Sequence, residues 1–240
     1  MEKKKKLCCI LSAITCSVAI GCQLCGTAVD KWSSYQIERN YSANSEGNAL
    51  TDSCTQCYAK IGLFHGCRTL DYEFGPRSVC FSTHDELTGS SRFISRSIWI
   101  TIVIFVLVSI AVGTVCCLMS LVNVFVSPAE TFCGVIGIII AAVVAFFATL
   151  VARIVFAVWM LNSDLSLLLH SEHIDSGFFV STQSRYSLSV MLLDVALFLY
   201  LSVVLLLCGW LWFHERNSIM PSVSKEEPIT YQIDAGVLMF

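Results

Sequence analysis

Four cysteines lie close together in one polar stretch of the chain: Cys54, Cys57, Cys67 and Cys80. In an oxidising compartment, an even set of cysteines predicts a disulfide framework. Four cysteines allow three pairings, and the sequence does not choose among them. We favour Cys67 with Cys80, which leaves Cys54 or Cys57 for a second bridge or for a partner. A redox or half-zinc Cys-x-x-Cys site is less favoured, because no second pair of ligands stands nearby.

Arg153 and Asp194 are charged residues that each interrupt a long apolar run, so they are candidates for an ion pair. Arg153 lies eight positions before residue 161, where its run ends, and Asp194 lies eight positions after residue 186, where its run begins. In helices, both side chains would sit about 12 Å from these two ends. Charged side chains at membrane depth are costly unless they are paired or functional. We therefore predict an ion pair that clamps two helices together. The alternative is an ion or proton pathway, which normally needs more than one polar ring.

Catalytic patterns are missing from the sequence. There is no glycine-rich phosphate loop, no His-Glu-x-x-His and no Gly-x-Ser-x-Gly. The histidines of the polar stretches are scattered: His65, His84, His170 and His173. His170 and His173 would share a helical face, but no third ligand stands beside them. We expect no enzyme, no cofactor and no metal site.

An unusually apolar chain must position these side chains. Of its 240 residues, 55% are hydrophobic and only 14% are charged, and the mean hydropathy is +0.71. Soluble domains carry about 25% charged residues, so a soluble enzyme and a disordered protein are both excluded. The formal net charge of −3 offers no basic field for nucleic acid. The composition predicts an integral membrane protein.

Four apolar runs are long enough to cross a bilayer as helices, which takes about 20 residues each. They span residues 7–29, 98–126, 131–161 and 186–213. The first run exceeds the apolar length of an ordinary signal peptide, so we expect it to be retained rather than cleaved. The expected fold class is an all-α membrane protein, a bundle of four transmembrane helices.

The orientation follows from four lysines, residues 3–6, which place the N-terminus in the cytoplasm. Residues 30–97 then form a long extracellular loop and residues 162–185 a shorter one. Residues 1–6, 127–130 and 214–240 are expected to be cytoplasmic. The expected location is the plasma membrane.

Several short signals fit this topology. Asn40 opens a glycosylation sequon in the long loop. Cys8 and Cys9 lie beside the lysines and are candidates for palmitoylation, although apolar packing explains them equally well. With the lysines they would also hold anionic lipid. The terminal Leu238-Met239-Phe240 matches the hydrophobic-x-hydrophobic end that binds a PDZ groove.

The long loop carries a recognisable order of residues: Trp32, then Gly62-Leu63-Phe64-His65-Gly66, then Cys67 and Cys80. This order resembles the signature of the claudin-like tetraspan superfamily, and the five-residue segment is most similar to the clarin family. Residues 168–174 and 234–240 also resemble clarin segments. The resemblance implies a small antiparallel β-sheet in the first extracellular loop, and residues 56–63 are compatible with one of its strands.

The resemblance further implies a non-enzymatic organiser of membrane domains, linked with sensory hair cells, synapses and actin-rich specialisations. The expected partners are lipids and other membrane or scaffold proteins, including PDZ and actin-linked proteins. An auxiliary channel subunit and a claudin-like barrier protein are the alternatives. Simpler roles also stay open for the motif: Trp32 as an interfacial anchor, Gly62 and Gly66 as turn residues with positive φ, and Leu63 with Phe64 as a packing face.

Overall fold

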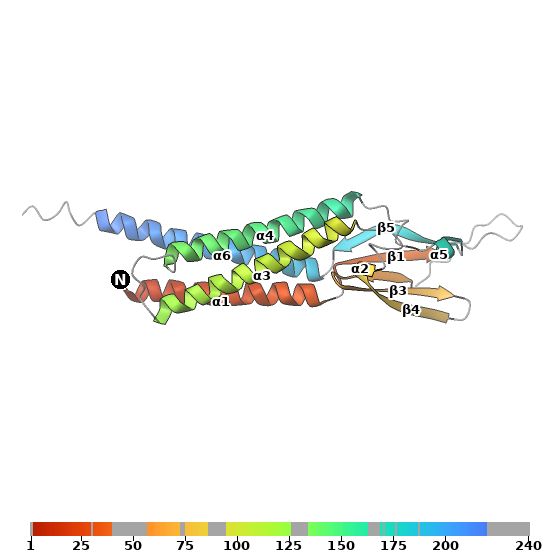
Figure 1. Cartoon of the computed structure of the whole chain (residues 1–240), viewed down its shortest axis with the longest axis horizontal. Coiled ribbons are helices and arrows are strands. Elements are labelled where there is room, and N and C mark those ends of the chain that lie inside the picture. The colour runs from red at the N-terminus through yellow and green to blue at the C-terminus, as the bar shows by residue number, and fades with distance from the viewer. Residues whose placement is uncertain are drawn as a thin grey trace, which may run out of the picture.

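Four long helices form the body of the molecule, and a small sheet extends from one end of them (Figure 1). The computed structural model describes residues 2–29, 31–39, 57–72, 75–85, 95–125, 134–162, 169, 171–175, 177–186 and 188–219. The helices are α1 (Glu2–Ala28), α3 (Arg96–Phe125), α4 (Val135–Asn162) and α6 (Leu188–Ile219). All four are long and apolar enough to cross a membrane. The chain therefore has the architecture of a multi-pass membrane protein.

The helix ends lie close to the predicted ones, with two extensions. α1 begins at Glu2 and takes in the lysines, and α6 continues past residue 213 to Ile219. None of the four prolines falls within these helices, so no backbone donor is lost. The buried side chains of α3 recur every three or four residues: Ile102, Val106, Ser109, Gly113, Cys116, Ser120 and Asn123. Its exposed face is apolar as well, as lipid contact requires.

The helices alternate in direction and pack as a closed ring. α1 contacts α3 and α6, and α4 contacts the same two helices. The end of α1, the start of α3, the end of α4 and the start of α6 all meet the sheet, while the N-terminus lies at the opposite end (Figure 1).

The sheet has five antiparallel strands in the order β4-β3-β2-β1-β5. Its strands are β1 (Ser33–Arg39), β2 (Tyr58–Ile61), β3 (His65–Tyr72), β4 (Gly75–Ser82) and β5 (Phe178–Tyr186). The short helices α2 (Thr83–Asp85) and α5 (Ser171–Asp175) lie beside it. The expected small antiparallel sheet is present, and its strands β1 to β4 come from the first loop. The fifth strand, β5, was not expected, because it comes from the second loop and pairs with β1.

One face of the sheet joins the core of the bundle. Tyr35 and Ala59 are paired across β1 and β2, and both are buried. They share a continuous hydrophobic cluster with Ile102 of α3, Phe156 of α4 and Leu193 of α6. Because three helices contribute to this cluster, the sheet packs on the bundle instead of hanging from flexible connections.

Candidate functional site at the junction of sheet and bundle

Trp32 fastens the start of the sheet to the end of α1. Its indole Nε1 donates a hydrogen bond of 2.9 Å to the carbonyl oxygen of Gly26, and its ring meets Phe156 edge-on with centroids 5.1 Å apart. Only 2% of the residue is exposed. Trp32 is therefore a packed core residue, and the role of exposed interfacial anchor does not fit it.

The motif segment of residues 62–66 connects β2 to β3 and is held from two sides. The carbonyl oxygen of Gly62 accepts a 3.0 Å hydrogen bond from Thr83 Oγ1, at the start of α2. The carbonyl oxygen of Leu63 accepts a 2.9 Å bond from Trp99 Nε1, in the first turn of α3. The bond from Trp99 ties the tip of the hairpin to the sheet-side end of the bundle, and the bond from Thr83 ties it to α2.

The three residues between the two glycines of this segment differ in exposure. Leu63 is buried in the core, whereas Phe64 and His65 are exposed. The Phe64 ring packs edge-on against Trp99, with centroids 6.4 Å apart, and His84 packs on the same indole at 5.1 Å. The segment thus presents an aromatic ring whose position is fixed by its neighbours. Leu63 and Phe64 do not share one packing face.

Gly66 is needed for space and not for backbone freedom. Neither Gly62 nor Gly66 has a positive φ, and the described glycines that do are Gly75 and Gly177. A Cβ at residue 66 would lie 2.7 Å from the ring of Phe81, closer than real Cβ contacts. The hypothesis that these two glycines serve positive-φ turns is therefore wrong. At Gly66 the ring of Phe81, on the neighbouring strand β4, occupies the space that a side chain would need.

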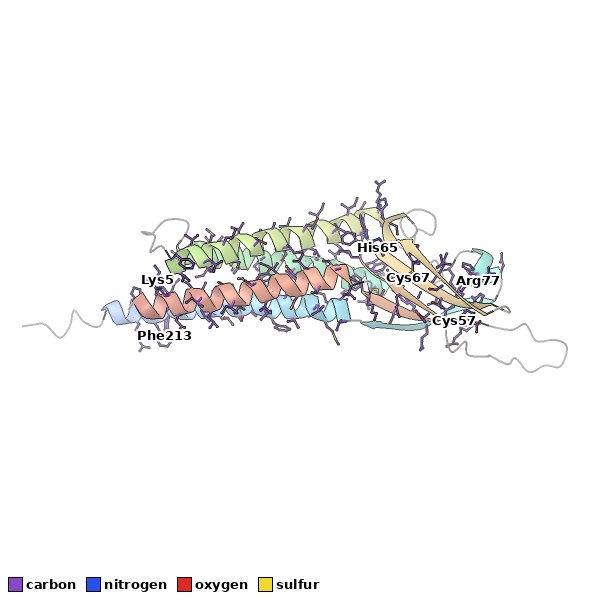
Figure 2. The ribbon with its side chains drawn as sticks, turned by 90° about the horizontal axis from the view of Figure 1, so that it is seen from below. Lys5, Cys57, His65, Cys67, Arg77 and Phe213 are labelled. Atoms are coloured by element: carbon purple, nitrogen blue, oxygen red, sulfur yellow. A yellow bond between two sulfur atoms is a disulfide. The ribbon has the colours of Figure 1, made fainter. Side chains whose placement is uncertain are left out.

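A disulfide joins Cys67 to Cys80 across β3 and β4, as the sequence favours. Cys57 is also disulfide-bonded, and its Sγ accepts a 3.1 Å hydrogen bond from the backbone N–H of Asp71. Cys54 and Asn40 lie outside the described residues. Figure 2 shows Cys57 and Cys67 on the sheet, remote from Lys5 and Phe213 at the opposite end.

Tyr35 links the sheet to α4. Its hydroxyl donates to Met160 Sδ at 3.2 Å, and burial raises the pKa of this phenol above its usual value. The group therefore stays neutral and keeps its proton for the contact.

A buried polar cluster joins all four helices, and it is not among the features predicted from the sequence. Gln23 of α1 donates from Nε2 to Ser109 Oγ of α3 and to Thr149 Oγ1 of α4, both at 2.8 Å. Its Oε1 accepts a 3.2 Å bond from the hydroxyl of Tyr200 on α6. The available signal was a glutamine within an apolar helix, because such residues hydrogen-bond across helices in lipid.

Gly113 provides the space for this cluster. A Cβ at residue 113 would overlap the hydroxyl of Tyr200. We expect Gly113→Ala to lower the free energy of unfolding by about 1–3 kcal/mol, as overpacking of a core does. Gly209→Ala is the matched control, because a Cβ there meets nothing within 4 Å. Thermal unfolding of both variants in detergent measures the difference, and equal midpoints would contradict the packing argument.

The predicted charged pair is in contact. Arg153 Nε donates to Asp194 Oδ1 at 2.8 Å, joining α4 to α6. The pair is not sealed inside the bundle, since 21% of the Arg153 side chain and 40% of the Asp194 side chain are exposed. No described residues form a group of three or more His, Cys, Asp or Glu side chains that could hold a metal.

We expect Asp194→Asn to lower the amount of protein at the cell surface and Arg153→Gln, added to it, to restore part of that amount. Removing one partner leaves an uncompensated charge at membrane depth, which is costly. Surface biotinylation of the two single variants and the double variant measures the coupling. Strictly additive losses would show that the two side chains act independently and do not clamp the helices.

The two cysteines proposed for acylation, Cys8 and Cys9, lie at the end of the bundle opposite the sheet and differ in exposure. Cys9 has no exposed surface, so its thiol is not accessible to an acylating enzyme in this fold. Cys8 is half-buried and stays a candidate.

On α6, Trp210 stacks on His214 with centroids 5.2 Å apart, and Arg216 lies 5.4 Å over Trp212. The terminal residues Leu238, Met239 and Phe240 lie outside the described residues.

No protein-family model and no curated protein matches this chain.

Proposed function

We propose that this chain is a non-enzymatic, clarin-like protein of the plasma membrane that organises protein complexes linked to actin. In this proposal the four helices cross the membrane, both termini are cytoplasmic, and the sheet lies outside the cell. Sensory cells of the hair-cell type and synapses are the expected settings. The proposal is supported by the four apolar helices, the lysines before the first of them, and the resemblance of residues 62–66 to clarins.

The observation that carries the proposal is the fastening of the sheet to the bundle. Trp32 donates a hydrogen bond to α1, and the backbone of Leu63 accepts one from Trp99 of α3, so the sheet is bound to two helices of the bundle. A surface held in this way is already ordered before a partner binds, so association costs less conformational entropy. The exposed ring of Phe64, at the centre of the motif, is the group that we expect a partner to cover.

Affinity purification from intact cells tests the proposal, with a tag in the first loop and non-reducing conditions. We expect actin-linked or PDZ proteins among the partners, and their loss when Leu238, Met239 and Phe240 are deleted. Phe64→Ala should reduce the capture of partners that bind outside the cell. Tyr58→Ala is its matched control, because this exposed ring lies on the sheet but outside the motif.

Two other outcomes would redirect the interpretation. Channel subunits as the main partners would favour the auxiliary-subunit alternative. Recovery of the chain alone, bridged between cells, would favour adhesion or a barrier. Either result would leave residues 62–66 as a feature of the fold without a scaffolding role.

A further inference from the structure

The charged pair Arg153–Asp194 lies on the outer surface of the bundle, at the seam between α4 and α6. Asp194 keeps 40% of its side chain exposed. Met191 and Phe198, one turn away on either side along α6, are exposed, as is Ile154 beside Arg153 on α4. The cluster around Gln23, by contrast, is buried. Within a membrane this seam therefore faces lipid, and charges exposed to hydrocarbon are costly.

The depth of the pair brings it near the lipid headgroups. α4 has 28 residues, and the apolar part of α6, Leu188–His214, has 27. At 1.5 Å per residue each is about 40 Å long, so about 5 Å extends beyond each side of a 30 Å hydrocarbon core. Arg153 lies nine residues before Asn162, and Asp194 lies six residues after Leu188. Both are then about 4–8 Å below the sheet-side boundary of the hydrocarbon.

The geometry points to a binding site for one zwitterionic phospholipid headgroup at this seam, with its phosphate on Arg153 and its ammonium on Asp194. This inference rests on the membrane insertion proposed above. The two protein charges are adjacent and opposite, with 2.8 Å between Nε and Oδ1. A headgroup that carries a phosphate and an ammonium side by side is complementary to them, and guanidinium groups bind phosphate well.

The same charges discriminate against other occupants. An anionic headgroup without an ammonium would satisfy Arg153 but meet the exposed carboxylate of Asp194 with a like charge. A partner helix is less favoured, because the pair lies near the headgroup level and its two charges cancel. Zwitterionic lipid is the occupant that offers a counter-charge to both side chains.

The test is native mass spectrometry of the full chain, released from nanodiscs that contain equal amounts of phosphatidylcholine and phosphatidylglycerol. We expect phosphatidylcholine to be the lipid retained on the wild-type protein. Arg153→Gln and Asp194→Asn should each weaken this retention about fivefold, the factor implied by the loss of one interfacial charge contact. Arg77→Gln, which changes an exposed arginine of β4, should leave it unchanged.

A double variant separates lipid binding from folding. Arg153→Met with Asp194→Leu removes both charges and keeps apolar bulk, a replacement that proteins generally tolerate. We expect its thermal midpoint to match the wild type while the preference for phosphatidylcholine disappears.

Three results would overturn the inference. The first is an unchanged lipid preference in the double variant, and the second is a preference of the wild type for phosphatidylglycerol. The third is the absence of any lipid preference, together with a protein that co-purifies with the wild type but not with the double variant. If the chain enters nanodiscs without any preference, the inference fails and the proposed function stands. If the chain does not enter them, both fail.

Discussion

Replacement of Trp32 by alanine is expected to lower the free energy of unfolding by about 3–5 kcal/mol, the range for deleting a large buried aromatic ring. The ring is 2% exposed and packs on Phe156. Its indole also donates to Gly26, where α1 approaches α6 so closely that a Cβ at residue 26 would lie 3.0 Å from the carbonyl oxygen of Ser189. Loss of the ring removes the contact between the start of the sheet and two helices. Thermal unfolding in detergent, followed by near-ultraviolet circular dichroism, measures the loss.

One further variant separates packing from hydrogen bonding at Trp32, and a second, at Trp212, serves as a control. Trp32→Phe keeps an aromatic ring but removes the indole donor, so we expect a loss of about 1 kcal/mol. Trp212→Ala deletes the same type of side chain from an exposed position on α6 and should change the midpoint little. If Trp212→Ala proved as costly as Trp32→Ala, the junction would not be the source of the stability.

Removal of the disulfide between Cys67 and Cys80 is expected to cost about 3 kcal/mol. The two residues are 13 positions apart, and a bridge that closes a loop of this length restricts the unfolded chain by about that amount. The bridge joins β3 to β4, which is an edge of the sheet, so its loss should loosen β4 first. Thermal midpoints of Cys67→Ser, Cys80→Ser and the double variant measure the effect.

The three serine variants should be equally destabilised, because either substitution alone already breaks the bridge. Cys208→Ser is the control, since this thiol is free and exposed, and it should behave like the wild type. Additive losses from the two single variants would indicate separate packing roles. A further shift of the double variant under reducing conditions would report the second disulfide, at Cys57.

The sequence was sufficient for features that depend on local pattern. Apolar runs without proline predict four helices because a membrane helix must satisfy its own backbone. Counting residues from helix ends also places Arg153 and Asp194 at similar depth, and the structure brings them to 2.8 Å. The sequence favours the disulfide between Cys67 and Cys80 but leaves three pairings open, and the structure contains that disulfide.

Features that depend on the meeting of distant segments were not predictable in this way. The strand Phe178–Tyr186 pairs with β1, and no residue pattern in either segment predicts that the two strands pair. The role of Gly66 depends on the position of Phe81 across the sheet, so its sequence context suggested a turn. Gln23 was a visible irregularity, but its partners Ser109, Thr149 and Tyr200 come from three other helices.

The pairing of β1 with β5 has a consequence for biosynthesis. The ribosome synthesises β1 directly after α1, but it synthesises β5 only after α4, the third of the four long helices. During that interval β1 has β2 as its only neighbour, and its other edge is unpaired. Unpaired strand edges invite association with other chains. A nascent or truncated chain that ends after α4 should therefore be bound by chaperones, whereas a chain shortened within residues 220–240 should fold normally.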